Sequence, residues 1–193
     1  MKIYIDSSNQ GDNIGVDGVS EAKRMRDFSD KVIYYLRQGQ SDLQIYTNTP
    51  DMTLQQTIDH ANSIQELDCY VANHSNASGS QEARGYEIFY SNFPIYSDES
   101  YNLAKKIWDR ITPLTNYDRG VYPDTRLFSS GLAVCRDVIA VSCLHELFFH
   151  TRQSDIDEYN NKKEALAKSV ALGIYDYLGL EYKEPQENTY RVM

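Results

Sequence analysis

The sequence has few cysteines, a single tryptophan and no cluster of basic residues. Cys69, Cys135 and Cys143 lie in apolar runs without C-x-x-C spacing, which favours buried free thiols in a reducing compartment over disulfides or a cysteine metal site. Nineteen Lys and Arg against 28 Asp and Glu give a net charge of -9, which repels phosphate backbones and anionic lipids. We therefore expect no nucleic-acid partner and no membrane partner.

The chain also lacks a long hydrophobic run. At its start, the apolar stretch Ile3-Tyr4-Ile5 is already followed by Asp6, which fits neither a signal peptide nor a membrane span. We expect a protein made in the bacterial cytoplasm. Its 193 residues, 41% hydrophobic and 24% charged, are ordinary for one globular domain.

Hydrophobic periodicity alternates between strand-like and helical segments. The pattern predicts strands at 2–6, 43–47, 67–74, 86–90, 132–136 and 139–144, and helices at about 20–38, 53–65, 97–111 and 161–178. This alternation favours an α/β domain over residues 1–180, with a mixed, mostly parallel central sheet and helices on both faces. Residues 181–193 form a charged tail, either a frayed terminus or the start of a second module.

Polar side chains that suit a metal site fall at predicted strand ends or at a helix start. Asn9 follows the first strand, Glu21 lies in the first helical turn, His74 ends the third strand, and Glu146 and His150 follow the last strand. Strand ends at one sheet edge converge in space. Catalytic zinc commonly takes His and Glu ligands and needs a further carboxylate to carry protons. The sequence therefore predicts a zinc hydrolase site at this edge.

The stretch from His145 to His150 differs from the helical zinc motif H-E-x-x-H by one residue. Two histidines five apart lie about 140° apart around a helix, so they cannot both bind one ion in that way. Because the stretch follows an apolar run and contains Phe148 and Phe149, we expect a strand end that turns into a loop. In a strand, His145 and Glu146 point to opposite faces.

A series of short motifs runs along most of the chain. The series comprises Ile3-Tyr4-Ile5-Asp6 with its polar loop, Gly18-Val19-Ser20-Glu21, Ala61-Asn62, Asp68 to Ala77, Gly85 to Tyr90, Leu103-Ala104, Arg119-Gly120-Val121, and Ile139 through Glu146 to Asp155. In this order it resembles the zinc-dependent N-acetylmuramoyl-L-alanine amidases, which include bacterial autolysins and phage endolysins. Among the matched family motifs are D-P-G-H-G-G, G-x-x-E and F-I-S-I-H-A-N-A.

The resemblance implies roles for individual residues. Glu21 and His74 resemble zinc ligands, and Glu146 resembles the catalytic carboxylate. Asn9 stands where the family has its first ligand histidine, so either Asn9 completes the zinc site or His150 enters it instead. The S-N-Q loop together with the segment ending in His150 resembles a divergent branch of these amidases.

Two further residues and a function follow from the same resemblance. Asn76 and Arg119 resemble substrate contacts. The implied activity is hydrolysis of the amide between N-acetylmuramic acid and L-alanine in peptidoglycan, with zinc as cofactor, at the cell wall or outside the cell. A wall-binding module is implied as a possible continuation of the C-terminal tail.

Two other functions stay open at this point. One is a wall-binding module that kept the fold and lost turnover because Asn9 replaced a ligand. The other is a zinc peptidase or deacetylase, which uses similar ligands but does not share the order of the motifs.

Overall fold

A computed structural model describes residues 1–39, 42–80 and 82–184. Most of the predicted C-terminal tail, residues 185–193, lies outside the described residues. The strands are β1 (Lys2–Ser7), β2 (Gln44–Thr47), β3 (Cys69–Asn76), β4 (Tyr86–Tyr90), β5 (Asp118–Pro123) and β6 (Ser142–Phe149). The helices are α1 (Glu21–Gln38), α2 (Leu54–Ser63), α3 (Ser97–Ile111), α4 (Ala133–Arg136) and α5 (Gln153–Tyr177), with 3-10 turns η1 (Thr112–Leu114) and η2 (Asp124–Arg126).

The strands form one six-stranded sheet in the order β2-β1-β3-β6-β4-β5. Neighbouring strands are parallel except for β4 and β6, which are antiparallel. The predicted mixed, mostly parallel sheet is therefore confirmed. Because β1, β3 and β6 run in the same direction, their carboxyl ends meet at one edge of the sheet, where ligand sites of open α/β folds usually lie.

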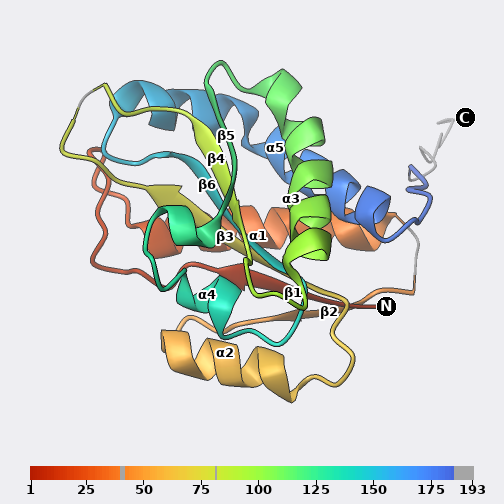
Figure 1. Ribbon diagram of the computed structural model, residues 1–193. Coiled ribbons are helices and arrows are strands. Elements are labelled where there is room, and N and C mark those ends of the chain that lie inside the picture. The colour runs from red at the N-terminus through yellow and green to blue at the C-terminus, as the bar shows by residue number, and fades with distance from the viewer. Residues whose placement is uncertain (40–41, 81, 185–193) are drawn as a thin grey trace, which may run out of the picture.

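Helices cover both faces of the sheet (Figure 1), as predicted. Ile3 and Ile5 of β1 pack into a large core with α1, α3 and α5, whereas Tyr4, between them, packs into a smaller core with α2 and α4. This division follows from the alternation of side chains along a strand. The face under the short α2 and α4 has much less helical cover than the other.

Helix α1 places a carboxylate at the carboxyl edge of the sheet. The side chain of Ser20 caps the helix by accepting a hydrogen bond from the backbone of Lys23, and Glu21 lies in the first turn. Buried apolar side chains at helical spacing, including Met25 and Phe28, fix the helix on the sheet. The predicted helix at 20–38 is confirmed, and its amino end faces the loop that follows β1.

The structure differs from the sequence prediction in four elements. The apolar run 132–136 forms the short helix α4 rather than a strand, because a run of this length has no periodicity that separates the two. The strand predicted at 139–144 begins at Ser142 and continues to Phe149, so it contains His145 and Glu146. Strand β5 was not predicted, and α5 begins at Gln153 instead of 161.

The three cysteines are buried and free, as expected. Across the described ranges, none of the helices has both the length and the apolar character needed to cross a lipid bilayer.

Candidate active site

The predicted site residues gather at the carboxyl ends of β1, β3 and β6. His74 of β3 lies directly opposite Glu146 of β6 in the parallel register. A cavity of about 690 Å³ opens at this edge, and both side chains line it. Apolar residues form much of the remaining wall: Met52, Leu54, Leu127, Phe128, Leu132, Val134 and Leu144. The arrangement combines a polar floor with an apolar wall, as small-ligand sites commonly do.

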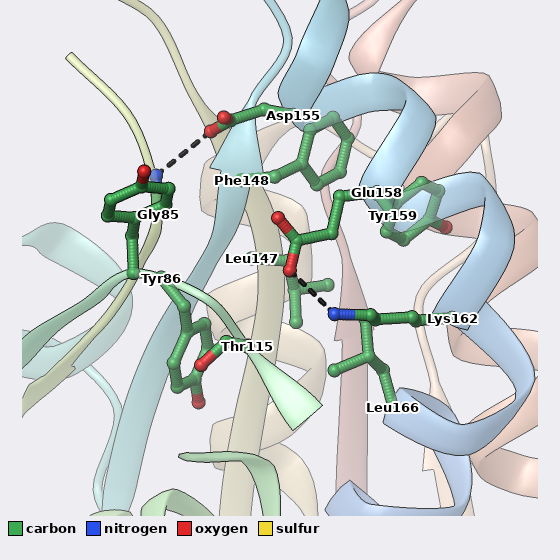
Figure 2. Close-up of a pocket in the computed structure, with 11 residues that line it drawn as sticks. Gly85, Tyr86, Thr115, Leu147, Phe148, Asp155, Glu158, Tyr159, Lys162 and Leu166 are labelled. Carbon is green, nitrogen blue, oxygen red and sulfur yellow. Dashed lines mark hydrogen bonds and ion pairs between the residues drawn. The ribbon is translucent and has the colours of Figure 1, made fainter. Parts of the chain in front are cut away.

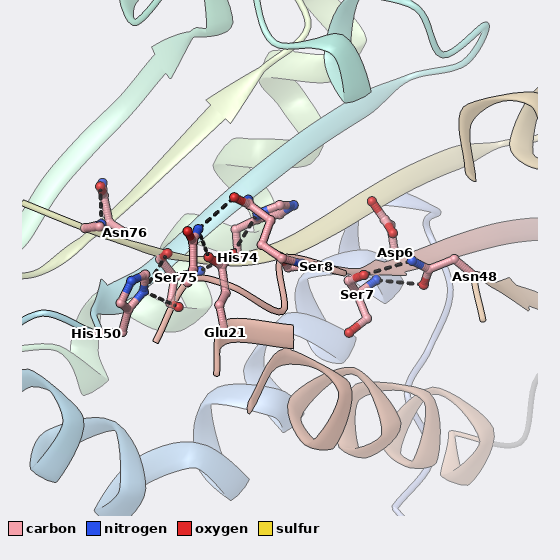
Figure 3. Close-up of polar contacts among 12 residues, drawn as sticks. Asp6, Ser7, Ser8, Glu21, Asn48, His74, Ser75, Asn76 and His150 are labelled. Carbon is pink, nitrogen blue, oxygen red and sulfur yellow. Dashed lines mark hydrogen bonds and ion pairs between the residues drawn. The ribbon is translucent and has the colours of Figure 1, made fainter. Parts of the chain in front are cut away.

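Glu21 lies behind the cavity wall and forms a direct contact with His74, which lines the cavity (Figure 3). The Nδ1 atom of His74 lies 2.9 Å from Oε1 of Glu21. Glu21 is 1% exposed and also accepts hydrogen bonds from the side chain of Asn13, at 2.9 Å, and the backbone N–H of Ser75, at 3.4 Å. These donors hold the Glu21 carboxylate in one orientation.

The contact shifts the pKa of both partners toward their charged forms. Burial alone would raise the pKa of Glu21, but the hydrogen bond and charge of His74 outweigh it and hold this pKa below its ordinary value. For His74, burial favours the neutral ring, but the hydrogen bond and charge of Glu21, with a smaller contribution from Glu146, raise its pKa. The contact therefore favours the ionised carboxylate of Glu21 next to the protonated ring of His74.

Glu146 is a half-buried residue, and one oxygen of its carboxyl group is buried without a protein partner. Its Oε2 atom has no hydrogen-bond acceptor or donor among the residues that the structure describes. Burial raises its pKa to about 8, and the negative charges of Glu21 and Glu87 add to the effect, whereas His74 opposes it. A buried carboxyl oxygen without a partner is costly for a protein fold, which suggests a functional reason for Glu146.

His145 lies on the opposite face of the sheet, as predicted. Its ring packs edge-on against Tyr86, with centroids 6.0 Å apart, within the large core. Burial lowers its pKa to about 3, so it is neutral near pH 7. Both ring nitrogens are buried, and neither has a hydrogen-bond partner in the described part of the chain. His145 is therefore a packing residue.

Both polar atoms of the Asn9 side-chain amide form hydrogen bonds within the protein. Its nitrogen donates to the backbone carbonyls of Thr49, at 2.9 Å, and Met52, at 2.8 Å. Its oxygen accepts a hydrogen bond from Arg26 at 3.0 Å. The amide thus anchors the loop after β1 to the segment that precedes α2, and the structure records no contact between Asn9 and the Glu21–His74 pair.

His150 lies just beyond β6 and is 2% exposed. Its Nδ1 atom is 2.9 Å from Oγ of Ser75 and 3.1 Å from the backbone oxygen of the same residue. Ser75 also donates its N–H to Glu21. His150 therefore contacts the Glu21–His74 pair only through Ser75, which bonds to both His150 and Glu21 (Figure 3).

Asn76 and Arg119 meet at a third residue, Glu87, which the sequence analysis did not select. Nδ2 of Asn76 donates to Oε1 of Glu87 at 2.8 Å, and Nε of Arg119 lies 3.0 Å from the same oxygen. Glu87 of β4 pairs across the antiparallel ladder with Glu146, so two carboxyl groups face the same side of the sheet. The signal in the sequence was a glutamate between the apolar residues Tyr86 and Ile88.

Gln10 and Asn13 are two further site residues missed by the sequence analysis. Nε2 of Gln10 lies 3.2 Å from Nδ1 of His74, and Asn13 donates to Oε1 of Gln10 at 2.7 Å. Asn13 also donates to Glu21, so the four side chains form a closed ring of polar contacts. The only signal in the sequence was the density of amide side chains in the loop after β1.

A second, small cavity lies on the other face of the sheet, between β4, β6 and α5 (Figure 2), and holds about 20 Å³. This is close to the space of one water molecule, so it does not suit a substrate. Asp155, in the first turn of α5, lies beside it and is not solvated. Instead its carboxylate is buried and accepts the backbone N–H groups of Gly85, at 2.9 Å, and Phe149, at 3.1 Å. Asp155 therefore fixes the start of β4 and the end of β6.

The donor chemistry at the site fits zinc in part. Imidazole nitrogen and carboxylate oxygen are common zinc ligands, and 2.9 Å between His74 and Glu21 approaches the roughly 3.3 Å that separates two donors on a tetrahedral zinc. However, within residues 1–39, 42–80 and 82–184, no group of three or more His, Cys, Asp or Glu side chains could hold a metal ion. Two zinc-type donors thus converge without a third of these types.

Comparison with known proteins gives a consistent result. The sequence profile described as N-acetylmuramoyl-L-alanine amidase matches residues 3–176. The fold is similar to an N-acetylmuramoyl-L-alanine amidase from Clostridium difficile 630, with a TM-score of 0.79, 24% identity, and coverage of 92% of this chain and 96% of that chain. It is also similar to AmiC2 of Nostoc punctiforme, with a TM-score of 0.78, 20% identity, and coverage of 93% and 97%. No curated protein sequence matches the chain.

Proposed function

The chain belongs to the N-acetylmuramoyl-L-alanine amidase family, and from this membership we propose that it hydrolyses the amide between N-acetylmuramic acid and L-alanine of peptidoglycan with the help of zinc. The family profile covers almost the whole described chain. The observation that carries the proposal is the convergence of three distant segments of the sequence: His74 and Glu146 line one cavity, and Glu21 contacts His74.

In this proposal Glu21 and His74 hold the zinc ion. A bound zinc would supply Lewis-acid chemistry, which polarises the scissile carbonyl and lowers the pKa of a water molecule. The backbone N–H of Ser75 and the side chain of Asn13 keep the Glu21 carboxylate directed at His74. Both are preorganised contacts, which reduce the cost of assembling the site when the ion binds.

Glu146 moves the proton in the proposed reaction. Its Oε2 atom, which has no partner in the described residues, would accept a proton from the attacking water and return it to the leaving amine. The burial that raises its pKa to about 8 favours the protonated form needed for the second transfer. The neighbouring positive charge of His74 or of an ion favours the carboxylate needed for the first.

The third zinc ligand expected from the sequence, Asn9 or His150, stays a prediction. For Asn9 to serve, its oxygen would have to leave Arg26. For His150 to serve, the ring would have to reach past Ser75, which holds Nδ1. Asn76 and Arg119 stay proposed substrate contacts, and both would act from positions next to Glu87.

The test is the release of new L-alanine amino termini from purified peptidoglycan, with the full chain in the presence of zinc or of a chelator. We expect release with zinc, loss with the chelator and recovery when zinc is restored. The variant His74→Ala should be inactive, and His60→Ala, which removes a histidine of α2 bonded to Tyr4, should be active. Release that persists after zinc is removed would contradict the role of zinc.

The same experiment separates an enzyme from a wall-binding module. A protein that sediments with peptidoglycan but releases no amino termini in zinc would support the binding module. The presence of Glu146 favours the enzyme, because a binding module has no need for a buried carboxyl oxygen without a partner.

A further inference from the structure

Arg119 lies at an irregularity in the pairing between β4 and β5. Two successive residues of β4 pair with Asp118 and Gly120 of β5, so Arg119 between them is an extra residue outside the regular register. A bulge of this kind changes the direction of a side chain, and bulges are frequent beside active sites. The side chain of Arg119 reaches Glu87, which faces the same side of the sheet as Glu146.

The guanidinium of Arg119 is held in place from two sides. Its Nε atom lies 3.0 Å from Oε1 of Glu87, and its Cζ atom lies 5.1 Å from the centre of the Phe149 ring. The same oxygen of Glu87 accepts a hydrogen bond from Asn76 at 2.8 Å, and Asn76 lines the cavity together with Glu146. Glu87 therefore connects Arg119 to the wall of the cavity.

These contacts leave part of the guanidinium for a ligand. A guanidinium has five N–H donors in a planar fork that matches the two oxygens of a carboxylate. Within the described residues, Nε of Arg119 faces Glu87, and Nη1 makes a long contact of 3.5 Å with the backbone oxygen of Arg84. The side chain of Arg119 is 39% exposed, so a ligand can reach its terminal nitrogens.

The cavity itself offers an anion no comparable group. Among the described residues that line it, none is a lysine or an arginine, and two of them, Asp6 and Glu146, carry carboxyl groups. The net charge of -9 also repels anions from the chain as a whole. An acidic ligand in the cavity would therefore direct its carboxylate toward β5 and away from α2 and α4.

Arg119 lies at a distance that suits the first residues beyond the scissile amide. Glu146 pairs with Glu87 across β6 and β4, and β5 is the next strand of the sheet. Because neighbouring strands are about 4.8 Å apart, the backbones of Glu146 and Arg119 are separated by about 10 Å. Two residues of extended peptide span at most about 7 Å, and the arginine side chain covers the remaining distance.

We propose that Arg119 binds a carboxylate of the substrate peptide, within two residues of the scissile amide, and that Glu87 is its positioning residue. This inference rests on the proposed function, because it takes the amide to be cleaved beside Glu146. The acyl side of that amide is a neutral acetylated sugar, so the carboxylate must come from the peptide. The site should therefore prefer an acidic peptide to the same peptide with carboxamides in place of its carboxylates.

The experiment measures binding of two ligands to the full chain by calorimetry: N-acetyl-L-alanyl-D-glutamate, and the same compound with both carboxyl groups converted to carboxamides. We expect the parent to bind the acid at least about tenfold more tightly, the gain typical of a hydrogen bond between charged groups. Arg119→Met should abolish this preference. Arg119→Lys, which keeps the charge without the planar fork, should keep part of it. Arg110→Met removes an exposed arginine paired with Asp176 and is the matched control, which should keep all of it.

Different results overturn different statements. If the parent binds both ligands equally or binds neither, or if the preference survives in Arg119→Met, the carboxylate site is wrong, while cleavage of peptidoglycan would still support the proposed function. A preference lost in Arg126→Met but kept in Arg119→Met also overturns the inference. Arg126 is the relevant alternative because it lies over the ring of Tyr122, whose hydroxyl bonds to the backbone of Arg119.

The opposite failure is equally distinct. If the preference depends on Arg119 but the chain releases no L-alanine amino termini from peptidoglycan in zinc, the carboxylate site stands and the proposed function fails. Thermal unfolding of each variant separates a lost contact from a lost fold.

Discussion

Neighbouring residues of β6 have opposite environments on the two faces of the central sheet. His145 points into the core formed with α1, α3 and α5, where aromatic and aliphatic side chains surround it. Glu146 points to the face under α2 and α4, into the cavity that it shares with His74. Both are titratable groups, His145 buried and Glu146 half-buried, yet only Glu146 lines a cavity that has space for a ligand. A buried ionisable residue thus indicates a site when a cavity accompanies it.

The largest effect should follow from changing the group on the cavity side. Glu146→Gln removes the proton carrier and keeps the size of the side chain, so we expect a loss of amidase activity of about 10² to 10⁴ fold. Stability should stay within about 1 kcal/mol of the parent, because the neutral amide avoids the cost of burying a charge. Release of L-alanine amino termini and urea unfolding measure the two. Glu99→Gln, an exposed glutamate of α3, is the control and should behave like the parent.

The next prediction compares stability on the two faces. Leu103 of α3 is fully buried in the large core, and Leu103→Ala should lower the free energy of unfolding by about 2–5 kcal/mol. Phe128 lines the cavity and is 60% exposed, so Phe128→Ala should change it by no more than about 0.5 kcal/mol. Urea denaturation at one pH measures both. A large loss in Phe128→Ala would mean that the cavity wall is part of the packed core.

The free energy of unfolding should depend on pH through His145, which lies on the packed face of the sheet. Its pKa is about 3 in the folded protein and near 6.5 when unfolded, so only the unfolded chain binds this proton between those values. The contribution of His145 is complete above pH 6.5 and is lost as the pH falls toward 3. Between pH 7 and pH 5 this amounts to about 2 kcal/mol.

The variant His145→Leu isolates this effect from other titrating groups. It fills the same apolar space without a proton site, so its stability should fall by about 2 kcal/mol less than that of the parent between pH 7 and pH 5. His60→Leu, on the opposite face, serves as the control. Parallel pH profiles for the parent and His145→Leu would show that the ring finds a partner or water when it is protonated.

Much of the fold follows from hydrophobic periodicity. The errors of the sequence prediction have identifiable causes. Helix α1 was predicted because its apolar side chains recur at helical spacing along residues 20–38. Strand β5 was missed because it is a half-exposed edge strand that contains Gly120, so it has no clean alternation. The start of α5 was placed late because its first turn is polar, and the Asp155 carboxylate in that turn is held by the backbone N–H groups of Gly85 and Phe149, which periodicity does not show.

The sequence predicted which residues of the candidate site lie at one edge of the sheet, because the ends of the strands determine that position. Glu21, His74 and Glu146 could be placed at one edge of the sheet, because parallel strands end together. The direction of the loop side chains could not be predicted, since it depends on Arg26, which lies 17 residues away from Asn9 and holds its oxygen. The role of Glu87 was hidden for the same reason, because its partners come from separate strands.

A small effect is also expected for the ion pair beside Glu146. Arg119 is 39% exposed, so its pair with Glu87 is partly solvated, and Arg119→Met should lower stability by no more than about 1 kcal/mol. The residual effect should come from Glu87, which stays buried next to Glu146 with Asn76 as its hydrogen-bond donor. A double-mutant cycle with Glu87→Gln measures the coupling, because the neutral amide no longer needs a cation. Coupling much above 1 kcal/mol would mean that the pair is effectively shielded from water, and the cavity face would then resemble the packed face more closely than its exposure indicates.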